Sequence, residues 1–182
     1  MKKLLALSAI GKDQPGIVAT LSKILFEKGC NLEDSSMTRL KGDFAVLLLI
    51  SLPEYMTLEA LKGPLERAAS SKGLTFTLRE LSSQETSFET GSSSLPYTLV
   101  VYGVDHPGIV YRVAQAAADH RVNITDLRTH VTSAKNTDLY SLVVEVDVPD
   151  EKTLEKFKQN LDALKKELSV EMSLNPVDTD EL

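Results

Sequence analysis

The chain has 182 residues, of which 42% are apolar and 25% charged, as in a soluble globular protein with one ordinary domain or two small ones. Its net charge of −6 argues against binding to nucleic acid phosphates, which requires clustered lysine and arginine. The single cysteine, Cys30, excludes an internal disulfide and indicates a reducing compartment.

The first residues, MKKLLALSAI, have the basic start and apolar run of a secretory signal. The apolar run is short, however, and the Asp-Gln-Pro-Gly that follows is no small-residue cleavage site. We therefore expect a strand here. Because no apolar run approaches the length that spans a membrane, we expect a cytoplasmic protein without membrane contact.

Alternating residues in KLLALSAI predict a first strand, followed by a turn at Gly11–Asp13. Apolar residues at helical spacing predict a helix that ends at Gly29: Ile17, Leu21, Ile24 and Leu25. Two strand segments, NLEDSSMTRL and FAVLLLISL, then flank the hairpin signal KGD. A second helix, ending near Gly73, is predicted from Leu58, Leu61, Leu65 and Ala68, and LTFTLREL alternates as a last strand.

The second half of the chain repeats the first. GKDQPGIV begins at Gly11 and GVDHPGIV begins at Gly103, 92 positions later, and Asn31 recurs as Asn123 at the same spacing. Beyond the stretch TSAKNTD the spacing becomes 96, so that Pro53 matches Pro149. A four-residue insertion in a turn-like stretch explains the change, because insertions in loops cost little. The matches run through both halves and indicate a duplication.

Each copy has the order strand, helix, strand, strand, helix, strand. This order predicts an α+β fold with two ferredoxin-like βαββαβ domains, each a four-stranded antiparallel sheet with two helices on one face. We expect the first domain at residues 1–81, a flexible linker rich in serine and threonine at 82–94, the second domain at 95–175 and an acidic tail at 176–182.

The open faces of the two predicted sheets differ. In the second copy Leu142, Val144, Val146 and Val148 alternate with Ser141, Val143, Glu145 and Asp147, as in a strand that is wet on one side. The wet side of the first copy carries Ala45, Leu47, Leu49 and Ser51 instead. We expect the open face of the first sheet to be covered, by the other repeat or by a second chain; scattered surface leucines are the alternative.

The repeated loop, Asp-x-Pro-Gly, lies where the first strand leads into the first helix. The carboxylates of Asp13 and Asp105 can accept hydrogen bonds from first-turn amides, and proline fits the first helical turn. Glycine lets a ligand or neighbouring backbone approach, and free helix amides favour a carboxylate. Asn31 and Asn123 offer both a donor and an acceptor, although their contact with the loop can come from another copy. The combination suits an α-amino acid.

The alternative is that Asp-x-Pro-Gly is only a good helix start, with Asn31 serving as a turn residue. Recurrence of the motif favours neither interpretation, because a duplication retains folding signals as well.

The segments DQPGIVATLSKILFEKGCNLEDS and DHPGIVYRVAQAAADHRVNITDL resemble the ACT domain, a small regulatory module of βαββαβ topology. The resemblance implies amino acid binding at interfaces between paired domains, through the loop after the first strand. Two such domains, with GCNLEDS in the first, are similar to the glycine cleavage system transcriptional repressor family, which implies action through a partner DNA-binding activator. Carried over by position, the ligand-binding residues are Asp13, Gln14, Gly16, Ile17 and Asn31 in one site and Asp105, His106, Gly108, Ile109 and Asn123 in the other.

Support for catalysis is weak. His106, His120 and His130 are not spaced as metal ligands, Cys30 has no evident base beside it, and no Walker-type phosphate loop is present. We therefore expect no catalytic residues, metal or cofactor.

Three functions remain open at this point. The preferred one is an amino-acid-sensing, non-enzymatic regulator that acts through a partner protein and forms a homo-oligomer. The others are an interaction module with vestigial ligand sites, and a regulatory subunit of an amino-acid or folate-metabolism enzyme.

Overall fold

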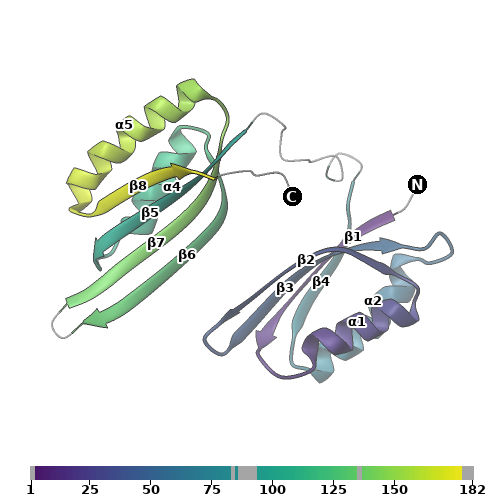
Figure 1. Ribbon diagram of the computed structural model, residues 1–182. Helices are drawn as coiled ribbons and strands as arrows, with labels where there is room; N and C mark the ends of the chain where they lie inside the picture. Colours follow the sequence, from purple (N-terminus) through teal and green to yellow (C-terminus); the bar gives the residue numbers. More distant parts are fainter. Residues whose placement is uncertain (1–2, 83–84, 86–93, 135–136, 178–182) are drawn as a thin grey trace. The chain divides into compact units, whose positions relative to one another are not determined.

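The computed structural model describes residues 3–82, 85, 94–134 and 137–177. It divides into two compact units, Met1–Glu89 and Thr90–Leu182, and each unit holds one copy of the repeat (Figure 1). The predicted linker, residues 82–94, and the tail, residues 176–182, fall mostly outside the described residues, so these boundaries stay predictions. No helix in the described part of the chain is long and apolar enough to cross a bilayer.

The first unit is a four-stranded antiparallel sheet with both helices on one face (Figure 1). Its strands lie in the order β2-β3-β1-β4. The elements are β1 (Lys3–Lys12), α1 (Ile17–Glu27), β2 (Asn31–Leu40), β3 (Asp43–Leu52), α2 (Leu58–Ser71) and β4 (Thr75–Glu80).

The second unit repeats this topology, with the strand order β6-β7-β5-β8. Its elements are β5 (Leu95–Val104), α4 (Ile109–Asp119), β6 (Asn123–Ala134), β7 (Thr137–Val148), α5 (Glu151–Leu168) and β8 (Glu171–Pro176). Even the irregularities recur, because a register shift lies between Leu32 and Asp34 in β2 and between Ile124 and Asp126 in β6. The predicted pair of ferredoxin-like βαββαβ domains is confirmed.

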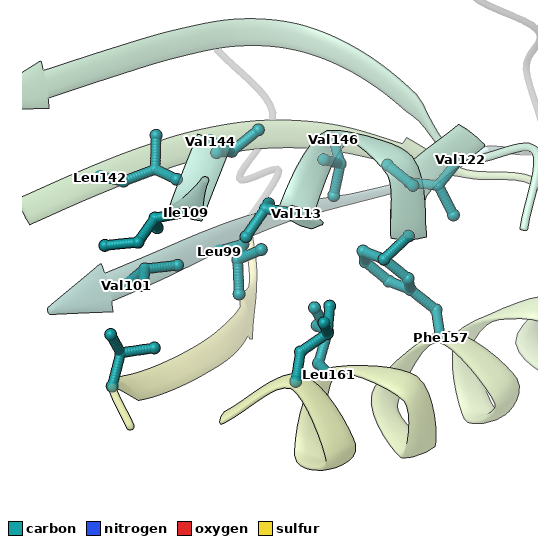
Figure 2. Close-up of a cluster of buried hydrophobic side chains, with 14 of the residues drawn as sticks. Leu99, Val101, Ile109, Val113, Val122, Leu142, Val144, Val146, Phe157 and Leu161 are labelled. Atoms are coloured by element: carbon teal, nitrogen blue, oxygen red, sulfur yellow. The ribbon is translucent and has the colours of Figure 1, made fainter. Parts of the chain in front are cut away.

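In the middle of the central strands of each unit, every second side chain is apolar and points into the core. In β7 the predicted inward residues Leu142, Val144, Val146 and Val148 are at most 2% exposed, and they pack with side chains of both helices (Figure 2). In β3 the same alternation buries Val46, Leu48 and Ile50. Ser51 is an exception: we placed it on the wet side, yet it is 4% exposed at a position flanked by Leu4 and Asn31 on the neighbouring strands.

Two local predictions need correction. Strand β1 does not stop at Gly11 but runs on to Lys12, because both residues pair with the start of β3. The four-residue insertion of the second copy is not only a longer turn. It also lengthens the β6–β7 hairpin, which pairs as far as Ala134 and Thr137.

Gly11 and Gly103 allow the first strand of each unit to pass close to the residue that follows the second helix. A Cβ on Gly11 would lie 2.8 Å from Leu74 Cδ2 and 2.9 Å from the carbonyl oxygen of Gly73. A Cβ on Gly103 would lie 2.8 Å from Val170 Cγ1. The first glycine of the repeated motif therefore serves packing between the strand and the second helix.

We predict that Gly11→Ala lowers the free energy of unfolding by about 1–3 kcal/mol, the usual cost of overpacking, because the contact at 2.9 Å is with backbone that cannot move aside. Gly42→Ala is the control, since a Cβ there has nothing within 4 Å and the backbone is not left-handed. Urea denaturation of both variants tests this, and equal stability of the two would contradict it.

Candidate functional site

The loop between β1 and α1 delivers an exposed helix N-terminus in each unit. Gly16 is the N-cap residue of α1, with φ at 88°, and Gly108 is the N-cap residue of α4, with φ at 103°. This left-handed conformation is strained for other residues and natural for glycine. In neither helix does a side chain accept a hydrogen bond from the first-turn amides. These amides are therefore left for solvent or a ligand.

The structure corrects the predicted role of the aspartates and prolines. Asp13 does not cap the helix; its carboxylate lies 3.4 Å from Arg39 Nη1, and its amide donates to the carbonyl of Gly42. The amide of Asp105 likewise donates to Asp138. Pro15 and Pro107 precede the N-cap glycines instead of standing in the first helical turn. The turn before each helix is longer than the motif predicts. The N-cap residue is the left-handed glycine, three residues after the aspartate that was expected to cap the helix.

Gln14 and His106 serve the fold in the same way. Gln14 Nε2 donates to the carbonyl oxygen of Lys72 at 2.8 Å, and His106 Nε2 lies 3.0 Å from the carbonyl oxygen of Leu168. Lys72 and Leu168 are equivalent positions of the two repeats, next to the C-terminal end of α2 and at that of α5. Both side chains therefore tie the loop to a helix end that would otherwise leave a carbonyl unpaired.

The remaining predicted residues of each site separate. Ile17 and Ile109 are 2% exposed and belong to the two cores, so only their amides can meet a ligand. Asn31 is exposed at the start of edge strand β2, opposite Ser51, whereas the loop lies at the other end of the sheet. Eight residues of strand separate the two ends, which is about 27 Å. Asn123 stands in the same relation to its own loop. No single domain brings the asparagine and the loop together.

Lys72 is a residue that the sequence did not indicate. Its ammonium lies 3.7 Å from the position a Cβ would take on Gly16. The equivalent residue in the second unit is Leu168, and Val131 stands where the first unit has Arg39. The two loops therefore differ in their charged groups: Lys72 and Arg39 lie near the first, whereas the second has neither and carries His106 where the first has Gln14. The position of Lys72 beside Gly16 depends on how the end of α2 packs against the β1–α1 loop, so only the structure shows it.

The described residues hold no group of three or more His, Cys, Asp and Glu side chains placed to bind a metal. Cys30 is half-buried against the first core, and burial raises the pKa of its thiol. A raised pKa keeps the thiol protonated and weakly nucleophilic.

His106 differs from Gln14 in one testable respect. Its Nδ1 also lies 3.2 Å from the carbonyl oxygen of Pro107, and two carbonyl acceptors favour the doubly protonated ring. The bonds to Leu168 and Pro107, and then the charge of Asp105, raise the pKa of His106 above 6.5. A raised folded-state pKa gives a stabilisation that is full below the unfolded pKa and is lost as pH rises through the folded one.

We therefore predict that the stability advantage of the natural chain over His106→Gln shrinks as pH rises from below 6.5 through the raised folded-state pKa of His106. Glutamine can keep the bond to Leu168, as Gln14 bonds Lys72 in the first unit, and removes the titrating ring together with its contact to Pro107. Urea denaturation of both proteins across this range, with an NMR titration of the His106 ring, measures the effect. A pKa at or below 6.5, or a difference that does not vary with pH, would contradict the prediction.

Comparison with known proteins identifies the family of the chain. The sequence profile of the ACT domain matches residues 3–79 and 98–175. The chain is 26% identical over 176 residues to the glycine cleavage system transcriptional repressor of Escherichia coli, covering 95% of this chain and 90% of that one. A UPF0237 protein of Methanopyrus kandleri is 38% identical over 68 residues, which are 37% of this chain and 76% of that one.

Among solved structures, an unknown protein from Galdieria sulphuraria is 28% identical and superposes with a TM-score of 0.85, covering 97% of this chain and 99% of that chain. With two profile matches that together span most of its length, the chain belongs to the ACT domain family and carries two copies of that domain.

Proposed function

We propose that the chain is a non-enzymatic regulator that binds a small carboxylate ligand, an amino acid by family resemblance, between ACT modules and acts through a partner protein. The observation that carries this proposal is the pair of exposed helix N-termini whose first-turn amides no side chain caps. Unpaired amides and the helix dipole favour an anion such as a carboxylate.

A complete site of this kind needs two modules. The loop can hold the carboxylate, but the asparagine amide that would meet the other end of the ligand lies about 27 Å away in the same domain. The asparagine must therefore come from another ACT module, in this chain or in a second copy. A ligand that touches both modules favours the arrangement in which they meet, to the extent that it binds that arrangement more tightly.

The first loop is the better carboxylate site of the two. Lys72 lies beside Gly16, whereas leucine occupies the corresponding position by Gly108. A cation next to the free amides adds to their attraction for an anion. We expect the loop at Gly16 to bind more tightly than the loop at Gly108.

Action through a partner protein is supported by the E. coli relative, which is named as a transcriptional repressor, and by the charge of −6 here, which disfavours direct contact with DNA. An interaction module without a ligand is the second candidate. One observation favours it: Gly11, Gln14 and Ile17 of the motif all have roles in the fold.

Thermal unfolding in the presence of each of the twenty amino acids separates the two candidates. A ligand at a hundredfold excess over its Kd stabilises the chain by about 2.7 kcal/mol. Stabilisation by one amino acid or a few related ones is the expected result. If no amino acid at millimolar concentration changes the unfolding midpoint, the result favours the interaction module without a ligand.

Variants of the ligand site make the test specific. Gly16→Asn adds a side chain beside the amides at the lowest backbone cost, because asparagine tolerates a left-handed conformation. Asn31→Ala and Lys72→Ala each remove one proposed contact. We predict that each variant weakens binding about tenfold or more, the value of a hydrogen bond to a charged group, and leaves the fold intact.

Gln159→Ala is the control, because Gln159 is exposed on α5, in the other domain from these three residues. Isothermal titration of the four variants with the stabilising amino acid gives the comparison. Unchanged affinity in the three site variants would rule out the site.

A further inference from the structure

The open face of the first sheet, the side turned away from α1 and α2, is apolar in its middle. Leu47 and Ile10 are 54% and 56% exposed, and Ala45 lies between them. The face has two adjoining hollows of about 470 and 340 Å³. Leaving such a surface in water is unfavourable, because burying apolar surface stabilises a protein by about 25 cal/mol for each Å² removed from water.

Two of the polar groups of this face satisfy each other. Serine and threonine hydroxyls flank the apolar middle, and Ser8 Oγ and Thr77 Oγ1 lie 2.6 Å apart. Among the described residues whose pairing places them on this face, the charged ones stand in its two outer rows. The register places Asp34, Leu49, Ala6 and Arg79 in one outer row and Asp43 and Lys12 in the other.

These charges are arranged so that the face complements itself. A twofold axis parallel to the strands, through the middle of the sheet, exchanges β2 with β4 and β3 with β1 between two facing copies. Asp34 of one copy then faces Arg79 of the other, and Asp43 faces Lys12. The guanidinium of Arg79 already pairs with Glu85 at 2.6 Å and has further donors for a second carboxylate.

The face is large enough to hold two copies together. Four strands about 4.8 Å apart and four rows of side chains cover about 400 Å² in projection. Accessible area exceeds projected area, so two such faces bury about 1,000 Å² or more, the lower limit for a specific interface.

The open face of the second sheet lacks these properties. Glu145 stands where the first sheet has Leu49, beside Asp126, and Arg128 replaces Ser36. The register puts Thr98 and Asn175 in the row of these two acids. Arg128 Nε pairs with Asp126 at 2.9 Å, but the same twofold would set Glu145 against Thr98, so that this carboxylate is buried with no cation facing it.

We propose that the open face of the first sheet is an interface between two copies of this chain, packed face to face about a twofold axis parallel to the strands. The two sheets lie about 10 Å apart, and Leu47 and Ile10 of each copy enter the hollows of the other. The interface is separate from the ligand loops, which lie beyond the strand ends, so it stands or falls independently of the proposed function.

Sedimentation of the full chain at up to about 100 µM, a range that covers micromolar interfaces, tests the proposal. We expect at least a dimer. Leu47→Glu buries two unpaired carboxylates per interface and halves the mass, with the dissociation constant raised about a hundredfold or more. Val143→Glu, at the equivalent position of the second sheet, leaves the mass unchanged. Circular dichroism shows that both variants are folded.

Charge reversal tests the axis itself. In the Asp43→Lys variant the new lysine of one copy faces Lys12 of the other, and in the Lys12→Asp variant the new aspartate faces Asp43. Like charges then repel across the interface, so we expect each variant alone to have half the natural mass. An equal mixture restores the assembly, because lysines of one chain then face aspartates of the other.

Four results would overturn the proposal: a natural chain that is monomeric, a Leu47→Glu variant of unchanged mass, a Val143→Glu variant whose mass is halved, or a mixture that fails to associate. The first would also be the result if another part of the same chain covered the face.

Discussion

The meeting of the β1–α1 loop with the end of the second helix is the contact on which each domain depends. Gly11 and Gly103 let the first strand of each domain pass close to Leu74 and Val170. The side chains of Gln14 and His106 bond the carbonyls two residues earlier, those of Lys72 and Leu168. A helix end without such a partner would leave carbonyls unpaired, at a cost of about 1–3 kcal/mol each if buried. The duplicated motif makes this structural contact in both halves.

The same contact prepares the candidate ligand site. Once side chains at positions 14 and 106 hold the loop, left-handed glycine can begin the helix without a capping side chain. In the first domain the contact also brings Lys72 beside these amides. Folding and binding therefore use different atoms of one loop: side chains hold it in place, and backbone amides face outward.

The fold was predictable from the sequence, because hydrophobic periodicity and an internal repeat are local signals. The details of the site were not. Asp13 was expected to cap the helix and instead pairs with Arg39, which comes from the β2–β3 hairpin. Lys72 was missed because its place beside Gly16 depends on how α2 packs. Topology also separates Asn31 from its own loop, as the predicted fold had allowed when it left the contact to another copy.

The two copies differ at the loop and at the open face of the sheet. The first domain has Lys72 and Arg39 near its loop and no charged side chain beside Leu47 on its open face. The second has Leu168 and Val131 at the two loop positions and Glu145 on its open face, which suits contact with water. Because an apolar sheet face needs a cover and a charged one does not, association falls to the first domain. The second domain then remains free to face solvent or another protein.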